Sequence, residues 1–458
     1  MPLARTPSIQ LRDRLTSLLP QRTLWELARE SGFIERTRKV EAPAFLWALV
    51  FGFAFGAERT ISALRRAYET ASKKKIVPSA FYDRFDAGLV KFLQAVVGLL
   101  LDRLAEPARA LAGDLAAFKE VLATDSTVIR LHDFLAKAFP GTRTNHTKAA
   151  LKLHVLMTVN GNGPKSVKVT AERKNDGHVL HVGKWTKDRL LLFDLGYYRY
   201  QLFDCIRRNG GYFLTRLKIN ANPTIVAVHR AWRGASVNLV GERLQDVIER
   251  LKREELDVEI EVQFKRRSYS GKQSSARQRF RLVGLRNEET GDYHLYVTNL
   301  PVERFNAKEV SAIYRARWTV ELLFKSLKSD FGLEQMPSAN KHVVQALVYA
   351  AIVTWVASRE LLLGVKALLG DKGRRVTEGR WTRLMRTWST LLLVVVTSPP
   401  RHGRELARTI EFTLLLECPD PHLKRQSLIE EVEQGIPVSH RARRSGSQGA
   451  AKSTTANR

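Results

Sequence analysis

The chain has 458 residues, of which 44% are hydrophobic, and this allows a large buried core and two to four domains. Its formal net charge of +29 indicates a polyanionic partner, and nucleic acid is favoured over a membrane surface because no basic amphipathic anchor is present. Two cysteines, Cys205 and Cys418, exclude a disulfide framework and zinc sites of the C-x2-C type.

Residues 1–112 are predicted to form a helical domain. An amphipathic segment begins at Leu24, a mostly apolar one follows Pro43, and a long one covers Ala80–Leu104. Basic clusters lie between these segments, at Arg36–Lys39, Arg65–Arg66 and Lys73–Lys75. Basic loops on a helical domain suit duplex DNA, and a cap or dimerisation domain is the alternative.

Residues 113–219 carry the pattern of a mixed sheet. Predicted strands cover 118–130, 151–159, 166–171, 190–194 and 212–217, and short helical segments cover 175–185 and 200–208. The first three strands follow one another, and a short turn joins the last two of them, which indicates an antiparallel meander. The order β-β-β-α-β-α-β predicts an α/β fold with helices on the faces of the sheet.

Residues 220–301 interrupt this plan with a β-rich insertion, in which Arg266–Lys272 reads as a basic hairpin loop. Residues 302–340 return to the core, and 341–437 form a C-terminal helical region with apolar helices at 340–366 and 380–397. Their most apolar runs, Val343–Ala357 and Leu391–Val396, are both shorter than the roughly 20 residues of a membrane span, so buried helices are expected. The basic tail, 438–458, is expected to be disordered. Residues 1–15 contain no secretory signal, and we expect a cytoplasmic, nucleoid-associated protein without membrane contact.

One predicted helix carries an unusual set of polar side chains. Neither Pro nor Gly occurs between Asn306 and Asp330, and the helix formers Leu, Ala, Arg, Lys and Glu dominate this stretch. At about 100° per residue, four polar side chains fall on one stripe within an arc of roughly 60°. They are Tyr314, Arg317, Glu321 and Lys328. An i,i+4 charge pair on a solvated helix face is the simpler reading of Arg317 and Glu321.

Two further acids end or interrupt apolar strands. Asp125 lies among Val, Leu, Ala, Thr and Ile in a predicted central strand, where a lone carboxylate is costly unless it is paired or bound to a cation. Asp194 follows the run Leu190–Phe193, and acids at the carboxyl ends of such strands lie where ligands bind. A solvated position for Asp125 and a turn before Gly196 for Asp194 are the structural alternatives.

These blocks resemble a known family. The run ATDST with Asp125, the run FDLGYY with Asp194 and the pattern Y-x2-R-x3-E-x6-K are similar to the three blocks of IS4-family bacterial DDE transposases, in the same order. The resemblance spans roughly residues 118–335. It implies an RNase H-like mixed sheet of order β-β-β-α-β-α-β-α, with an insertion before the acid on the helix.

The resemblance also implies an activity and a site. It implies that Asp125, Asp194 and Glu321 bind two Mg²⁺ or Mn²⁺ ions, and that the enzyme cuts and joins double-stranded DNA at terminal inverted repeats, as a homodimer on DNA. Tyr314, Arg317 and Lys328 would hold the DNA backbone. Trp318 is a candidate to stack on an unpaired base, with half-buried packing as the alternative. No glycine-rich phosphate loop occurs, so no nucleotide cofactor is expected.

Two rival functions stay open at this point. One is a domesticated DNA-binding protein that no longer cuts, and the other is a related RNase H-like nuclease specific for DNA structure. His178 and His181 have the spacing of a weak metal pair, but a polar connection is the simpler reading, because no matched second pair occurs.

Overall fold

The structure of the protein is a computed structural model of the whole chain. It describes residues 8–35, 40–56, 58–104, 110–142, 148–161, 163–174, 176–230, 238–269, 272–334 and 336–421. The basic cluster at 36–39 and the tail at 438–458 lie outside the described residues, and so do 270 and 271 in the basic hairpin loop.

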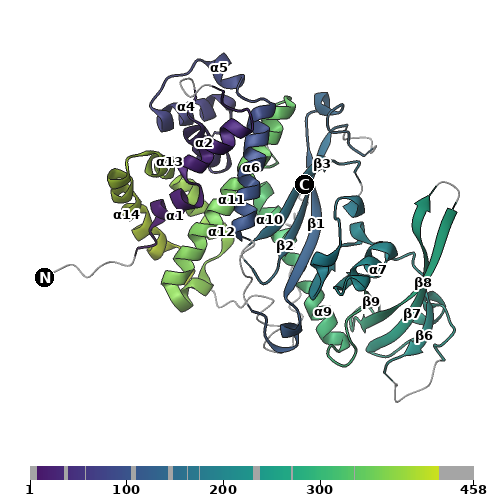
Figure 1. Cartoon of the computed structure of the whole chain (residues 1–458). Coiled ribbons are helices and arrows are strands. Elements are labelled where there is room, and N and C mark those ends of the chain that lie inside the picture. The colour runs from purple at the N-terminus through teal and green to yellow at the C-terminus, as the bar shows by residue number, and fades with distance from the viewer. Residues whose placement is uncertain are drawn as a thin grey trace, which may run out of the picture.

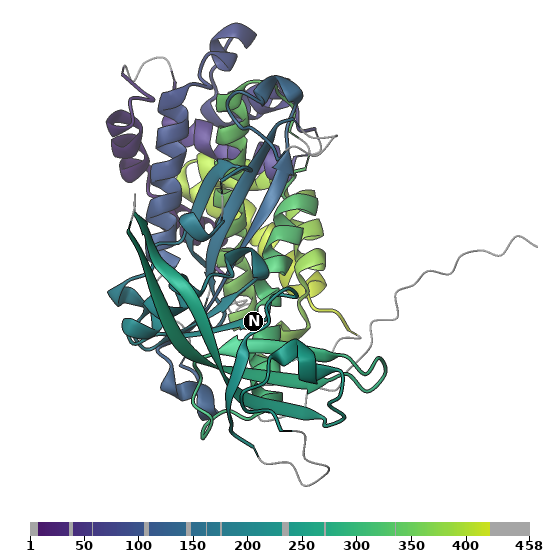
Figure 2. The ribbon, with the colours of Figure 1, turned by 90° about the vertical axis from the view of Figure 1, so that its right-hand side faces the viewer.

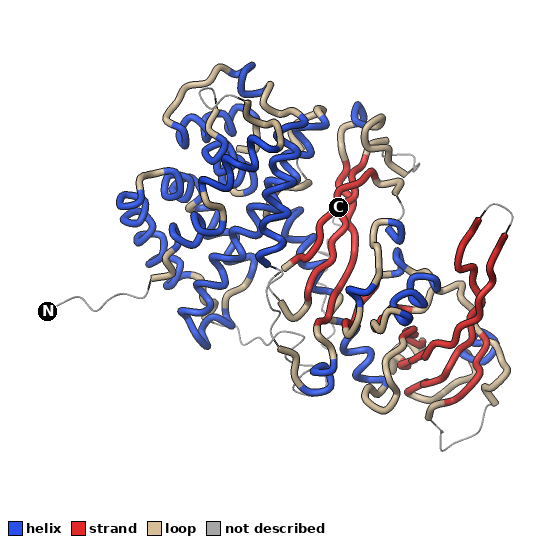
Figure 3. The backbone as a smooth tube through the Cα atoms, viewed as in Figure 1, coloured by secondary structure: helices blue, strands red, loops and turns tan. Residues whose placement is uncertain are grey.

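A nine-stranded mixed sheet runs through the described residues, in the order β3-β2-β1-β4-β5-β9-β8-β7-β6 (Figures 1 and 3). Its strands are β1 (Glu120–Arg130), β2 (Ala150–Thr158), β3 (Pro164–Ala171), β4 (Arg189–Phe193), β5 (Tyr212–Arg216), β6 (Thr224–Val228), β7 (Glu255–Tyr269), β8 (Lys272–Arg286) and β9 (Tyr293–Thr298). β1, β2 and β3 pair antiparallel, whereas β1, β4 and β5 run parallel. The first five strands therefore form the predicted RNase H-like sheet.

Helices from both ends of the chain gather on one side of this sheet (Figures 1 and 3). The N-terminal helices are α1 (Leu11–Leu18), α2 (Gln21–Glu30), α3 (Ala42–Leu49), α4 (Ile61–Ser72), α5 (Pro78–Tyr82) and α6 (Ala87–Leu104). The later ones are α11 (Lys341–Leu369), α12 (Glu378–Thr387), α13 (Ser389–Thr397) and α14 (Pro400–Glu417). α11 packs against α6 and α1, and α1 packs against α14, so the two helical regions share one apolar core. Their roles as separate domains stay predictions.

The helix α11 is the centre of that core. It is long and apolar enough to cross a membrane, with a mean hydropathy of 1.5 in its most apolar window, but 83% of that window is buried inside the protein. Leu153 and Val155 of β2 meet α10 (Trp318–Ser329) and α11 at Leu323, Leu327 and Trp355. This burial against the sheet is typical of a core helix, which confirms the predicted buried helix.

Three predicted helices differ from the observed ones. The connection at 175–185 contains two single 3₁₀ turns, Asp176–His178 and Lys184–Thr186, because Gly177 and Gly183 disfavour a longer helix. The segment Ala80–Leu104 divides into α5 and α6, where Asp86 accepts a hydrogen bond from the Leu89 amide and caps α6. The segment at 380–397 divides at Trp388 into α12 and α13.

The predicted insertion extends the core sheet. β9 pairs antiparallel with β5, with Leu214 opposite Thr298, and β8, β7 and β6 follow outward. A short helix, α8 (Leu244–Ile248), lies between β6 and β7. The strands of the β7–β8 hairpin are much longer than β6 and β9, and the hairpin projects from the rest of the insertion, as Figure 2 shows. The insertion is β-rich as predicted, and it shares one hydrogen-bonded sheet with the strands that carry Asp125 and Asp194.

A buried ion pair fixes the base of this insertion. Arg281 of β8 contacts Asp257 of β7 twice, with Nε–Oδ1 at 2.8 Å and Nη2–Oδ2 at 2.6 Å. The same guanidinium donates to the carbonyl oxygens of Leu300, Pro301 and Phe305, on the segment that leads into the next helix. Both side chains are less than 5% exposed, so the pair has little access to water.

We expect Arg281→Leu to lower the free energy of unfolding by about 3–5 kcal/mol, because it leaves the Asp257 carboxylate buried without its partner. The measurement is urea denaturation followed by circular dichroism. The matched control is Arg279→Leu, two residues earlier on β8, whose side chain is 61% exposed and whose replacement should cost no more than about 0.5 kcal/mol. Equal effects of the two changes would contradict a special role for the pair.

Candidate active site

Asp125 and Asp194 lie side by side because their strands are neighbours. β1 and β4 pair in parallel, and the last pair in register is Thr124 with Phe193. Asp125 and Asp194 are the next residues of the two segments, so the two aspartates lie at the same level of the sheet. The first and fourth strands of the sheet therefore adjoin.

Asp125 lies on the face of the sheet that α10 covers. It is opposite Val155 of β2, and Ala123, two residues earlier, is fully buried in the core shared with α10 and α11. The Asp125 side chain is 16% exposed, and its Oδ1 accepts a hydrogen bond from the Ser126 amide at 2.7 Å. Period-2 alternation thus brings the carboxylate to the helix that carries the third acid.

Glu321 reaches Asp125 through one guanidinium. Arg317 Nη1 lies 3.1 Å from Asp125 Oδ2, and Arg317 Nη2 contacts Glu321 Oε1. The i,i+4 pair weighed as the simpler reading does exist, but the Arg317 side chain is only 11% exposed and also bridges to the central strand. It is therefore part of a three-residue cluster at the sheet, and it is not a pair on a solvated face.

The carboxylates in this cluster repel one another. The pKa of Asp125 is raised to about 6, mainly by burial, and the charges of Asp194 and Glu321 add to the rise. The hydrogen bond from Ser126 and the charge of Arg317 act in the opposite direction. The site is therefore short of positive charge, although the chain as a whole carries a large positive charge.

The expected helix over 306–330 is interrupted. α9 (Ala307–Arg315) and α10 are separated by Ala316 and Arg317, where the backbone amides bond to carbonyls three residues earlier. This 3₁₀-like turn keeps the chain right-handed but changes the direction of the side chains relative to an ideal α-helix. The prediction of one continuous polar stripe is therefore wrong in its geometry.

Tyr314 is buried instead of lying on the rim of a groove. It is 5% exposed, and its hydroxyl donates to the carbonyl of Phe193 at 3.2 Å, directly before Asp194. The guanidiniums of Arg317 and Arg216 lie over its ring, at 5.5 and 5.8 Å from the centroid. In this structure Tyr314 supports the backbone at Asp194, and a contact with DNA stays a prediction.

Lys328 and Trp318 lie at the two ends of α10. Trp318 begins the helix next to Arg317 and is 37% exposed, and Lys328 lies in its last turn and is half-buried. Seven residues separate Lys328 from Glu321, which is about 10 Å along the axis on nearly the same face. Both side chains therefore lie on the element that carries the third acid, and no contact shown here decides their predicted role in binding DNA.

Asp176 is a further acid next to the site, which the sequence analysis did not find. Its Oδ1 accepts a hydrogen bond from the Ser126 hydroxyl at 2.9 Å and lies 3.2 Å from Lys152 Nζ. A Cβ built on Gly196 would lie 3.0 Å from Oδ2, so Asp176 also packs against the turn after Asp194. It thus touches the residue after Asp125 and the segment after Asp194, and it holds the two together.

His154 completes the surroundings of Asp176. Its Nδ1 lies 3.3 Å from Asp176 Oδ1, and its Nε2 shares a hydrogen bond with the Thr170 hydroxyl at 2.9 Å. Burial lowers the pKa of His154 to about 4, so the ring is neutral at pH 7 and Lys152 supplies the positive charge. A helical period or strand alternation does not reveal Asp176, because it lies in a 3₁₀ turn.

The three acids have the donor chemistry of a divalent-metal site. Carboxylate oxygens suit Mg²⁺ or Mn²⁺, and a bound cation would offset the burial and the neighbouring negative charges that together raise the pKa of Asp125. In the described part of the chain, no three His, Cys, Asp or Glu side chains already surround a common point as metal ligands. Arg317 instead contacts Asp125 and Glu321, as a cation shared by the two carboxylates would.

This combination of fold and acids is that of an enzyme that acts on nucleic-acid backbones. The model of the "Transposase DDE domain" family matches residues 116–357, which is more than half of the chain. The chain belongs to this family. DDE transposases are metal-dependent DNA endonucleases and strand transferases, and they bind DNA.

Curated relatives agree over most of the chain. The transposase for insertion sequence element IS231D of Bacillus thuringiensis subsp. finitimus is 23% identical over 390 residues, which are 76% of this chain and 79% of that protein. The transposase for IS1151 of Clostridium perfringens is 20% identical over 371 residues, 75% of this chain and 78% of that protein. The predicted membership among IS4-like transposases is confirmed.

One solved structure is similar at a lower level. The cryo-EM structure of the piggyBac transposase synaptic complex with hairpin DNA covers 93% of this chain and 88% of that chain, with a TM-score of 0.46 and 9% identity. No residue assignment depends on this similarity.

We expect Asp125→Asn to stabilise the metal-free protein at pH 7.5 by about 1–3 kcal/mol. The raised pKa means that the folded state disfavours the ionised form of Asp125. The free energy of unfolding therefore falls as pH rises from about 4, the pKa of Asp125 in the unfolded chain, to about 6, its pKa in the folded chain. The gain should therefore be absent at pH 4 and complete above pH 6. Urea denaturation in EDTA at several pH values measures it, and a gain that is independent of pH would contradict the electrostatic explanation.

Proposed function

We propose that the chain is the transposase of an insertion sequence and that it cuts DNA at terminal inverted repeats and joins the ends to target DNA. Asp125, Asp194 and Glu321 would hold two Mg²⁺ or Mn²⁺ ions. The observation that supports this assignment is the proximity of the acids: β1 and β4 bring two of them to one level, and Arg317 contacts both the third acid and Asp125.

The chain's own residues would divide the remaining work among them. Two divalent ions between such carboxylates supply a Lewis acid on each side of a phosphodiester, for the attacking and the leaving oxygen. Tyr314 would position Asp194 through its hydrogen bond to the Phe193 carbonyl, and Asp176 would position the segment of Asp125 through the Ser126 hydroxyl. Lys328 and Trp318 would bind the DNA strand along α10, through a phosphate and an unpaired base.

The partners follow from the reaction. Two ends of an element must be handled together, so we propose a homodimer on DNA. The helical region 1–112, with its basic residues at 65–66 and 73–75, is proposed to bind the ends or to dimerise. Localisation with the nucleoid in the cytoplasm follows from the substrate.

Replacement of each acid tests the site. Asp125→Asn, Asp194→Asn and Glu321→Gln should each reduce metal-dependent cleavage of a DNA end by about 10³-fold or more, while binding of the same DNA is kept. The assay is gel separation of a labelled end in Mg²⁺ or Mn²⁺, with binding measured in EDTA. Asp133→Asn is the matched control, because this acid follows β1 closely and its side chain is 56% exposed. Full cleavage by one of the three variants would remove that residue from the site.

Lys328 tests the contact with the DNA backbone. We expect Lys328→Ala to weaken binding of the terminal repeat and to reduce the slope of log K against log salt by about one, because one phosphate contact is lost. Fluorescence anisotropy between 50 and 200 mM salt measures the slope. Lys308→Ala on α9 is the control, since that side chain is 70% exposed and lies 3.8 Å from Glu255. A slope equal to that of the unchanged protein would exclude the phosphate contact.

A further inference from the structure

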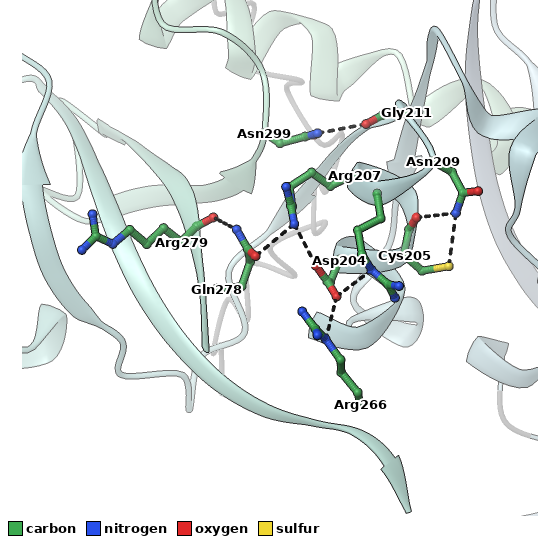
Figure 4. A network of polar contacts seen from close by, with 10 residues as sticks. Asp204, Cys205, Arg207, Asn209, Gly211, Arg266, Gln278, Arg279 and Asn299 are labelled. Carbon is green, nitrogen blue, oxygen red and sulfur yellow. Dashed lines mark hydrogen bonds and ion pairs between the residues drawn. The ribbon is translucent and has the colours of Figure 1, made fainter. Parts of the chain in front are cut away.

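A second cluster of charged residues lies where α7 (Tyr200–Arg208) meets the β7–β8 hairpin (Figure 4). Asp204 of α7 is fully buried, with 0% exposure. Three guanidiniums surround its carboxylate: Arg207 Nη2 lies 3.2 Å from Oδ1, Arg208 Nε lies 3.1 Å from Oδ2, and Arg266 Nε lies 3.2 Å from Oδ2. We call Arg207, Arg208 and Arg266 the arginine triad.

Two separate elements build the arginine triad. Arg207 and Arg208 lie in the last turn of α7, where positive charge also interacts favourably with the carboxyl end of the helix. On β7, the buried side chains of Val262 and Phe264 face α7, and strand alternation places Arg266 next on the same side. The helix and the hairpin are further joined by a hydrogen bond from Gln201 Nε2 to the Lys265 carbonyl, at 2.6 Å.

The arginine side chains are held at one end and exposed at the other. Their side-chain exposures are 39%, 52% and 45%, although the carboxylate that they contact has none. Arg208 and Arg266 use Nε for Asp204, and within the described residues their terminal nitrogens form no other hydrogen bond. Arg207 is further fixed by a hydrogen bond to Gln278 Oε1 at 3.1 Å. The terminal nitrogens therefore lie at the surface in a restrained arrangement.

The charge of the cluster exceeds what Asp204 needs. One guanidinium balances one buried carboxylate, as at Arg281 and Asp257 in the same insertion. Three guanidiniums on one carboxylate leave a local charge of +2, and planar guanidinium forks match phosphate oxygens. Because Asp204 restrains the side chains before a ligand arrives, less side-chain entropy is lost on binding.

We propose that the arginine triad is a binding site for the phosphate backbone of a DNA duplex, and that Asp204 is the buried residue that positions it. This inference rests on the proposed function, because it takes DNA as the substrate. The site is separate from the three-acid centre. α7 begins six residues after Asp194, and Arg207 and Arg208 lie at its far end, roughly 10 and 12 Å along the helix from its first residue. The duplex would thus touch the β-rich insertion and the core at once.

Salt dependence of DNA binding tests the proposal. The full chain is titrated onto a labelled duplex of random sequence in EDTA, between 50 and 200 mM salt. Arg208→Ala and Arg266→Ala should each reduce the slope of log K against log salt by about 0.9, so that affinity falls about 3.5-fold less over this range than in the unchanged protein. Arg208→Lys keeps the charge and should keep the slope.

The matched control is Arg279→Ala. Arg279 lies on the opposite face of the same hairpin, its side chain is 61% exposed, and its replacement removes the same charge. An equal loss of slope in Arg279→Ala would show that only total charge matters and would overturn the proposal. An unchanged slope in both triad variants would also overturn it. If the melting temperature of these variants is lowered while the slope is unchanged, the arginines only stabilise the fold around Asp204.

Cleavage separates this inference from the proposed function. If the unchanged protein cuts DNA but the triad variants keep its salt slope, the triad proposal fails alone. If the unchanged protein does not cut DNA, but replacement of the triad arginines reduces the salt slope of its duplex binding, the proposed cleavage fails and the triad proposal stands.

Discussion

The contact of one guanidinium with two carboxylates determines the arrangement of the site. Arg317 bridges a central strand to a helix that follows it by almost two hundred residues, and it does so with its side chain largely buried. Without a shared cation, Asp125 and Glu321 would repel each other at low exposure, where water screens charge poorly. Two interactions therefore hold α10 on the sheet: the ion pairs of Arg317 at the site, and the apolar packing of Leu323 and Leu327.

Around this contact, the backbone is fixed on both neighbouring strands. The parallel pairing of β1 and β4 sets the level of the two aspartates, and a one-residue slip would turn one of them to the other face of the sheet. Tyr314 fixes the carbonyl before Asp194, and Asp176 holds Ser126 and approaches Gly196. These contacts come from segments far apart in the chain, so the geometry of the site depends on the assembled core and not on any local motif.

The sequence predicted the elements well and the contacts poorly. The sequence predicts Asp125 and Asp194 because each is an acid in or directly after an apolar, β-rich run. Hydropathy and turn residues also predict the order of the strands along the chain. The break at Ala316 was not found, because composition favours helix throughout that stretch and a 3₁₀ turn depends on tertiary contacts. The sequence does not predict the burial of Tyr314, because a tyrosine side chain is stable both in an apolar core and at a solvated surface. Asp176 was missed because its partner, Ser126, is 50 residues away.

Two buried acids and the acid cluster of the candidate active site show how charge is distributed between structure and function. Asp257 has one arginine, and this pair is balanced and closed to water. Asp204 has three, and the surplus faces outward. At the candidate active site the ratio is reversed, because the ion pairs that the described residues make with Asp125, Asp194 and Glu321 all come from Arg317. In a chain of net charge +29, a cluster with three carboxylates and one guanidinium is a local exception. On the proposed function, the surplus positive charge around Asp204 would face the phosphates of DNA, and the surplus negative charge at the candidate active site would hold divalent cations between protein and phosphate.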